Sequence, residues 1–525
     1  MLGGIQFNAF VVTKKLSVIG FHVNHYRRWD PLAFPHVARN TVACSHGFVF
    51  LLYVRTGGIC NFLFLNYTIS MQTDSISYVQ YDKMINTPIP RLVGTLAVPT
   101  VVSMLVTSVY NMADTYFVSQ INTEASAAVG IVFPIMAIIQ AFGFTLGMGC
   151  GSIISRRLGE KNNRQANVVA STAFFSSLLI GLFVTFFGNM FSSQFMKAVG
   201  ASATVLPYAT SYARYIFYGA PFMVASFVLN NILRSEGKAL FSMIALAAGG
   251  VLNIVLDPVF IFVLKLGIGG AAIATLASQT VSFFILLSWF FRRKAICSIS
   301  IKNLSKNPAV LGSIVLTGLP SLSRQGLASV ATILLNRACV LYGDAAVAAM
   351  AITTKIVMFV ASIMIGIGQG FTPVAGYNYG AKRFDRVKSS YWFTVATGMV
   401  VLGFLSVFGF VFAKEIVSFF RNDPQVIAIG TVALRWQIAV LPLHPLIVAT
   451  NMLLQSTGYV TQSTFLSCNR QGVYFIPIIL LFPSLLGLFG IEIAQACADF
   501  LSVLTAIPYL VWFMKKINHF PKNNI

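Results

Sequence analysis

Residues 147–161, GMGCGSIISRRLGEK, return 221 positions later as residues 368–382, GQGFTPVAGYNYGAK. Two closely spaced glycines, a third glycine and a lysine occupy the same places in both segments. The offset holds in both directions along the chain, pairing Pro99 with Pro320, Arg214 with Arg435, Pro221 with Pro442, Asn230 with Asn451, Ser235 with Ser456 and Gly237 with Gly458. From about residue 85 onward, the chain therefore consists of two copies of one plan.

The composition is that of an integral membrane protein. Of the 525 residues, 57% are hydrophobic and 10% are charged, which leaves too few polar side chains to cover a globule in water. A helix needs about 20 apolar residues to cross the bilayer. Runs of that length lie near 91–117, 127–150, 167–189, 209–233, 238–264, 270–291, 310–341, 347–371, 390–412, 426–455, 461–483 and 488–514. The sequence predicts an all-α membrane fold with twelve transmembrane helices.

Six spans in each copy mean that both copies start on the same side of the membrane. The predicted fold is therefore two six-helix bundles related by a parallel pseudo-two-fold repeat, with an N-lobe over 85–300 and a C-lobe over 301–525. Long apolar halves repeated in this way are typical of secondary transporters, which place the solute site between the halves.

The chain has a net charge of +22, and its basic residues are distributed between the loops as a membrane topology predicts. Eighteen basic residues cluster in alternate loops and the C-terminal tail, whereas only Lys197, Lys265, Lys414 and Arg421 lie in the other loops. This asymmetry argues against nucleic acid as the partner and places both termini in the cytoplasm.

The first 84 residues differ from the rest. Residues 1–70 carry four of the six histidines and no run long enough to cross a membrane, since the apolar stretch 47–54 is broken by Arg55. Either this segment is a regulatory or amphipathic arm, or the start is assigned too far upstream and the chain begins at Met71 or Met84. We favour the second interpretation and treat 1–84 as a doubtful extension.

Two aspartates lie inside predicted spans of the first copy. Asp114 is in the first span and Asp257 in the fifth, where Asn253 precedes it by four residues and Pro258 follows it. The spacing places Asn253 and Asp257 one turn apart on one helix face. Pro258 has no N–H for the carbonyl of Ile254, which leaves a further oxygen acceptor nearby. Carboxylate, amide and carbonyl oxygens suit an alkali cation or a proton-loaded site.

The second copy has lost these carboxylates, because the offset maps Asp114, Asn253 and Asp257 to Leu335, Tyr474 and Ile478. The asymmetry favours a coupling-ion site in the first half over structural pairing. In the second half, ion pairs that lock helices and basic side chains that reach the headgroups explain most charged residues. Lys355 is the exception, since its counterpart is Pro134 in mid-span, and we expect it to line a cavity.

Two glycine clusters, Gly143, Gly147, Gly149 and Gly151 in the second span and Gly366, Gly368 and Gly370 in its copy, permit close helix approach and local bending. A dimerisation seam is the alternative. The seven cysteines form no CxxC pair, and no Walker sequence or Ser/His/Asp arrangement occurs. We therefore expect no cofactor, no metal apart from Na⁺ at the cation site, and no enzymatic activity.

Several motifs together resemble the multidrug and toxic compound extrusion (MATE) transporters, in particular their MepA-like and DinF-like branches. They are Leu96-Ala97-Val98-Pro99, Asp114, Asn253-x-x-x-Asp257-Pro258, Gly269-Gly270-Ala271-Ala272-Ile273-Ala274-Thr275 and Gly376-Tyr377-Asn378-Tyr379-Gly380-Ala381-Lys382. The resemblance covers about residues 85–515. It implies an H⁺- or Na⁺-coupled antiporter that exports bulky, often cationic amphipathic compounds by alternating access.

The resemblance also implies roles for individual residues. The cation site of the family's N-lobe falls on Asp114, Asn230, Asn253, Asp257 and Thr275, and its helix-bending proline falls on Pro99, with Pro258 as a second bend. Tyr110 and Asn111 join Lys355 as candidate cavity-lining residues. The expected partners are a small-molecule substrate and membrane lipid, and the expected state is a monomer in the plasma membrane.

Two alternative functions are less consistent with these residues. A lipid-linked sugar flippase of the same wider superfamily would favour a strongly basic cavity for pyrophosphate, but the first half carries acids. An integral-membrane enzyme would need a paired acid and base or a metal motif at one membrane face, and the sequence contains none that we recognise.

A chain that starts at Met71 should insert and transport like the full-length protein, because residues 1–70 contain no predicted span. Export by the two forms, compared at matched expression, tests this. A truncated chain that inserts normally but does not transport would show that the arm is functional.

Overall fold

The computed structural model describes residues 6–12, 18–22, 49–55 and 77–519. The chain divides into a unit Met1–Val79 and a unit Gln80–Ile525. The first unit contains an antiparallel sheet of β1 (Gln6–Val12), β2 (Val18–His22) and β3 (Val49–Arg55), in the order β2-β1-β3. In this sheet Asn8 lies opposite His22 on one side and Tyr53 on the other. Most of the doubtful extension lies outside the described residues.

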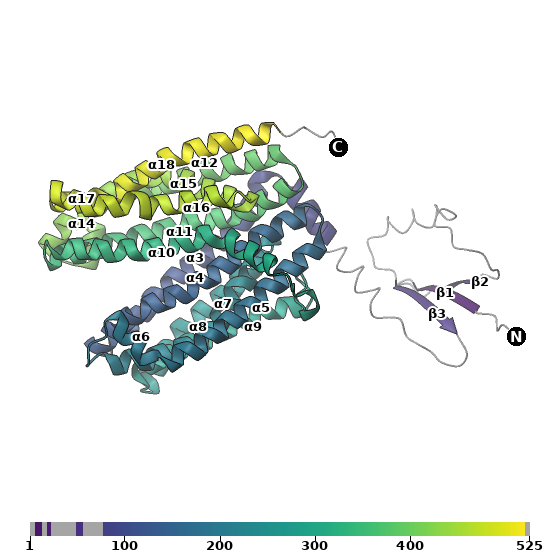
Figure 1. Cartoon of the computed structure of the whole chain (residues 1–525), viewed down its shortest axis with the longest axis horizontal. Helices are drawn as coiled ribbons and strands as arrows, with labels where there is room; N and C mark the ends of the chain where they lie inside the picture. Colours follow the sequence, from purple (N-terminus) through teal and green to yellow (C-terminus); the bar gives the residue numbers. More distant parts are fainter. Residues whose placement is uncertain (1–5, 13–17, 23–48, 56–76, 520–525) are drawn as a thin grey trace. The chain divides into compact units, whose positions relative to one another are not determined.

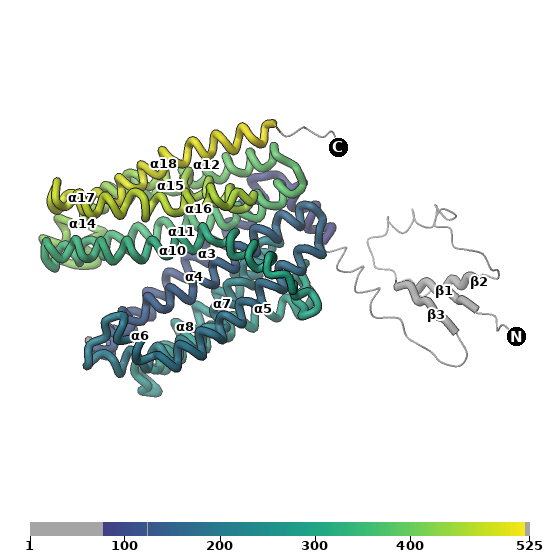
Figure 2. Tube along the Cα trace, viewed as in Figure 1, coloured from purple at the N-terminus to yellow at the C-terminus, as the bar shows by residue number. Residues whose placement is uncertain are grey.

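The second unit is helical and forms two lobes, which run from purple to teal and from green to yellow in Figure 2. The first lobe contains α3 (Ile89–Ser119), α4 (Thr123–Gly159), α5 (Asn163–Met190), α6 (Ser192–Val199), α7 (Leu206–Ser235), α8 (Ala239–Pro258), the π-helical turn η1 (Val259–Val263) and α9 (Gly267–Phe291). The connection between the lobes includes the 3₁₀ turn η2 (Ile301–Asn303).

The second lobe repeats this order. It contains α10 (Pro308–Val340), α11 (Asp344–Gly380), α12 (Phe384–Val411), α13 (Ala413–Phe420), α14 (Pro424–Val440), η3 (Leu441–Leu443), α15 (His444–Thr457), α16 (Val460–Cys468), the π-helical segment η4 (Asn469–Phe475), α17 (Ile476–Leu486) and α18 (Leu488–Asn518). The helices α4, α5 and α6 match α11, α12 and α13 residue for residue at the offset of 221.

The predicted fold class is confirmed for the helical unit. Within the described part of the chain, eleven helical segments are long and apolar enough to span a membrane. The helix α10 is 33 residues long and stands where α3 stands in the first copy, so it completes the twelve. The most apolar 18-residue stretch of α10 has a lower mean hydropathy than the corresponding stretches of the eleven other segments, and the α10 sequence includes Arg324 and Arg337.

Short polar signals set the helix ends. The Asn122 side chain accepts the Ala125 N–H at 2.6 Å, and the Asp423 carboxylate accepts the Gln425 and Val426 N–H groups, so both residues cap helix N-termini. Lys161 and Lys382, equivalent in the repeat, take left-handed backbone angles directly after α4 and α11, with φ of 59° and 58°. The turns that follow α4 and α11 therefore share their geometry.

The bundle end that carries the basic loops, here called the basic end, is where the lobes meet. In Figure 1 the two lobes lie together at this end, near the start of α3 and the end of α18, and spread apart toward α6 and α17. Between the lobes, α3 packs on α11, and α4 packs on α10 and α11. In the repeat α3 is equivalent to α10, and α4 is equivalent to α11. The α3–α11 and α10–α4 contacts are therefore equivalent to each other, as a pseudo-two-fold axis between the lobes requires.

Glycines let the helix backbones touch across this axis. A methyl group at Gly149 would overlap the Ile314 carbonyl oxygen, and one at Gly318 would overlap the Thr145 carbonyl oxygen. Gly366 packs in the same way on Val101, and the Thr100 hydroxyl donates to the Gly366 carbonyl at 2.8 Å. Glycines of both clusters thus serve the contact between the lobes of one chain, which we call the glycine seam.

The connection between the lobes is fastened to the first lobe. The buried Glu236 carboxylate accepts the N–H groups of Ile296 at 2.8 Å and Cys297 at 2.7 Å. Further along, the N–H groups of Ser298, Ser300 and Ser305 donate to the α5 side chains of Asn167, Ser171 and Thr172, respectively. The chain is held in this way almost to the start of α10.

Gly318→Ala should destabilise the closed arrangement at the basic end, because its methyl group would overlap the backbone of α4. Gly312→Ala on the same helix is the matched control, since nothing lies within 4 Å of its Cβ position. We expect a loss of about 1–3 kcal/mol for the first change and none for the second. Thermal unfolding of the two purified variants measures this, and equal midpoints would contradict the seam.

Candidate functional site

Four of the five side chains predicted to bind a cation lie in the half of the first lobe away from the basic end. Asp114 is near the end of α3, Asn253 and Asp257 are near the end of α8, and Thr275 is near the start of α9. These helices are neighbours, because α8 packs on both α3 and α9. Asp257 has no exposed surface, and Asn253 and Thr275 are buried.

A hydrogen-bonded chain links α8 to α9. The Asn253 side-chain amide donates to Asp257 Oδ1 at 3.2 Å and lies 3.4 Å from Thr275 Oγ1. The helical spacing of Asn253 and Asp257 therefore does bring their side chains into contact. The helix α8 ends at Pro258, and the π-helical turn η1 follows directly. The predicted break at Pro258 thus lies beside the Asp257 carboxylate.

Tyr212 on α7 contacts Asp114 and was not predicted. Its hydroxyl donates to Asp114 Oδ2 at 3.5 Å. A tyrosine near a helix end is usually an anchor at the membrane surface. The complete burial of Tyr212, which the sequence does not reveal, distinguishes it from such an anchor.

The site contains buried oxygen atoms that no other group satisfies. Among residues 77–519, Asp114 Oδ1, Asn253 Oδ1, Asp257 Oδ2 and the Ser278 hydroxyl have no hydrogen-bond partner. Ser278 lies one turn along α9 from Thr275 and was not predicted either. Neither aspartate forms a salt bridge within the described residues. Two carboxylates in one apolar region, without a basic partner, require a cation or a proton for charge balance.

Two other predicted residues, Asn230 and Pro99, lie apart from the two aspartates. The Asn230 amide donates to Ser242 Oγ at 2.6 Å, which joins α7 to α8 nearer the basic end, and no direct hydrogen bond joins it to either aspartate. Pro99 lies inside the continuous helix α3, next to Thr100 in the glycine seam. The bending role of Pro99 stays a prediction.

The three candidate cavity residues differ in exposure. Tyr110 is half-buried against Gly250 of α8, whereas Asn111 is exposed on α3. Lys355 is exposed on α11, about three turns from Gly366 and so on the same face of that helix. Because Gly366 contacts α3, this face of α11 is the one turned toward the other lobe.

The charged residues of the second lobe include a closed pair. Arg470 in η4 donates to both carboxylate oxygens of Asp499 on α18, at 2.7 and 3.1 Å, and Gln495 donates to the same carboxylate at 2.7 Å. This bidentate geometry fits the prediction of helix-locking ion pairs. It leaves Asp499 without the free oxygens that characterise the aspartates of the first lobe.

Comparisons with known proteins agree with the repeat. A family model described as MatE matches residues 99–259 and 320–481, two segments that start 221 residues apart. The multidrug export protein MepA of Staphylococcus haemolyticus is 29% identical over 412 residues, which cover 78% of this chain and 91% of that protein. MepA of Staphylococcus aureus strain N315 is 27% identical over 421 residues, which cover 80% of this chain and 93% of that protein.

A solved structure described as the outward-facing conformation of a multidrug resistance MATE family transporter of the MOP superfamily aligns with a TM-score of 0.80. It is 28% identical, and the alignment covers 83% of this chain and 98% of that one. The family model alone accounts for more than half of the residues, once in each copy of the repeat. The chain therefore belongs to the MATE family of multi-pass membrane transporters, which are not enzymes.

Proposed function

We propose that this protein is a multidrug exporter that exchanges bulky, often cationic amphipathic compounds for H⁺ or Na⁺. The observation that carries the proposal is the group of unpartnered oxygens around Asp114 and Asp257 in the first lobe. The matched relatives named as multidrug export proteins support the same activity.

The coupling ion would bind where the charge is uncompensated. Asp114, Asn253, Asp257 and Thr275 offer oxygen ligands of the kind that hard cations prefer, and a proton would serve equally by neutralising one carboxylate. Binding of either ion relieves the repulsion between the two aspartates. Tyr212 would orient Asp114 for this step.

Coupling requires only that the ion and the substrate favour different arrangements of the lobes. The structure is closed at the basic end, where the glycine seam lies. With the basic end in the cytoplasm, as the loop charges indicate, this is the outward-facing state. When the substrate is neutral, inward movement of one ion across 100 mV supplies about 2.3 kcal/mol, which sustains roughly a fifty-fold substrate gradient. One-for-one exchange with a monovalent cationic substrate moves no net charge, so the concentration gradient of the ion then drives export.

The remaining expectations are part of the same proposal. The protein would act as a monomer in the plasma membrane with both termini in the cytoplasm. Lys355, Tyr110 and Asn111 would contact the substrate between the lobes, since Lys355 and Asn111 are exposed.

Asp114→Asn and Asp257→Asn should each abolish gradient-driven export while the protein still inserts, because each change removes a charge and keeps the side-chain size. Uptake of a fluorescent cationic dye into everted vesicles, energised separately by proton and sodium gradients, measures export and identifies the ion. The matched control is Asp385→Asn, which changes an exposed carboxylate at the start of α12.

Near-normal export by both variants would move the coupling site to the second lobe, where Glu492 and Lys355 would be tested next. Thr275→Ala removes a neutral ligand and should do less harm than Asp257→Asn. A larger loss for the threonine variant would contradict the assignment of charge as the decisive feature.

Tyr212→Phe should lower export about five-fold without abolishing it, since one hydrogen bond to a carboxylate is lost while the ring is kept. Tyr218→Phe is the control on the same helix, because Tyr218 is exposed. Initial export rates over a range of ion concentrations decide the point. Equal rates for the two variants would remove Tyr212 from the site.

A further inference from the structure

A buried arginine between the lobes has no acidic partner. Arg234, near the end of α7, is 5% exposed, and its guanidinium donates to the amide oxygens of Asn231 and Gln369 and lies 3.8 Å from Met148 Sδ. All these partners are neutral. Within residues 77–519 the salt bridges involve other basic groups.

The nearest acid in sequence is already engaged. The Glu236 carboxylate accepts the N–H groups of Ile296 and Cys297 and lies 3.9 Å from Lys238 Nζ. The charge of Arg234 is therefore left uncompensated in a buried position, which is costly.

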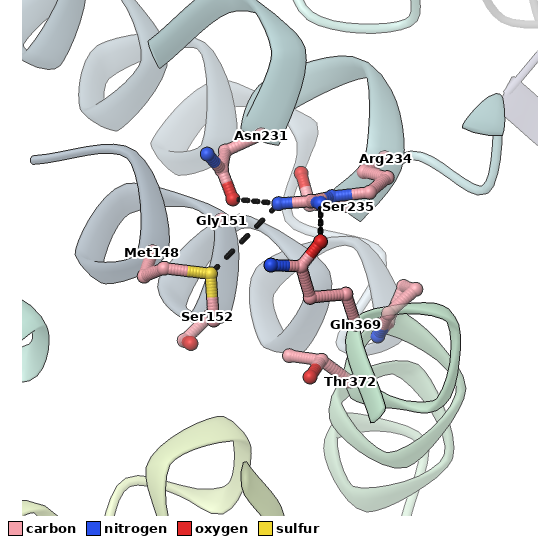
Figure 3. Close-up of a pocket in the computed structure, with 9 residues that line it drawn as sticks. Met148, Gly151, Ser152, Asn231, Arg234, Ser235, Gln369 and Thr372 are labelled. Carbon is pink, nitrogen blue, oxygen red and sulfur yellow. Dashed lines mark hydrogen bonds between the residues drawn. The ribbon is translucent and has the colours of Figure 1, made fainter. Parts of the chain in front are cut away.

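A cavity of about 20 Å³ lies beside the guanidinium, with Met148, Ser152, Asn231, Gln369 and Thr372 among its walls (Figure 3). Its size suits one water molecule or one halide ion. The Ser152 hydroxyl is 1% exposed and has no hydrogen-bond partner, so it offers a second donor in the same cavity wall. Thr372 Oγ1, in contrast, already donates to the Gly368 carbonyl at 3.0 Å.

The charged guanidinium and the free hydroxyl of this cavity occur in only one copy of the repeat. The offset of 221 maps Arg234 to Gln455 and Ser152 to Pro373, so neither the charge nor the second donor is duplicated. Gln455 instead donates to the Thr317 carbonyl at 2.9 Å inside its own lobe. Met148 and Gln369 are equivalent to each other and lie on either side of Arg234, which places the cavity near the pseudo-two-fold axis.

We propose that this cavity binds a small monovalent anion of halide size, held by the Arg234 guanidinium and the Ser152 hydroxyl. A water molecule would accept hydrogen bonds from the donors but would leave the buried charge uncompensated. An anion accepts the hydrogen bonds and also compensates the charge. The site is built from α4 and α7 of one lobe and α11 of the other. An occupied site therefore stabilises the state closed at the basic end, and separation of the lobes dismantles it.

The test is thermal unfolding of the purified full chain in sodium gluconate, with gluconate replaced stepwise by bromide or chloride. Sodium stays constant, so the proposed cation site contributes equally throughout, and gluconate is too large for the cavity. We expect a saturable rise in Tm with halide. Arg234→Gln should abolish the rise, and Arg157→Gln, which removes an exposed ion pair with Glu160, should keep it.

Ser152→Ala keeps the charge and removes one donor, so it should raise the halide concentration for half-effect about five-fold. This variant tests the site even if Arg234→Gln does not fold. Asp257→Asn should retain the halide response, which separates this site from the proposed coupling site. A bromide anomalous peak beside Arg234 and Ser152 would locate the ion.

Identical unfolding in gluconate and halide, or a saturable response that survives in both Arg234→Gln and Ser152→Ala, would overturn the proposal. A cavity with no bromide peak at saturating bromide would do the same, and would assign a water molecule to it.

Discussion

Contact between helix backbones at the glycine seam is the constraint on which the arrangement of the lobes depends. Carbonyl oxygens of one lobe lie where a side chain of the other would have to stand, so only glycine fits at Gly149 and Gly318. The contact relies on close packing of helix backbones, because lipid offers apolar groups no reason to associate.

The two copies share a frame but not their polar contents. The bounds of α4, α5 and α6 and the lysine turn after α4 recur at the offset, because they follow from apolar patterning and a few glycines and lysines. The aspartates of the first lobe, Arg234 and the Arg470–Asp499 pair do not recur at the offset. The first lobe holds two unpaired carboxylates, the second holds a closed Arg470–Asp499 pair, and an unpaired arginine lies between them. The repeat therefore supplies the helical frame, and its departures supply the unpaired polar groups.

The contrast between the shared helical frame and the unshared polar groups explains what the sequence could predict. Helix number and the parallel repeat were readable because they are periodic, and the contact of Asn253 with Asp257 was readable because it is local to one helix. Tyr212 and Ser278 were missed because their roles depend on which helix packs beside them. Asn230 shows the same limit, since its partner Ser242 is on a neighbouring helix. The dimerisation alternative for the glycines was open for the same reason.

The fastening of the connection between the lobes sets where movement can begin. Hydrogen bonds hold the chain to the first lobe as far as Ser305, and α10 starts at Pro308, so only a couple of residues are left as a pivot. From that pivot α10 extends for 33 residues, roughly 50 Å at 1.5 Å per residue. If α10 turned as a rigid rod, a rotation of one tenth of a radian at the basic end would displace its far end by about 5 Å.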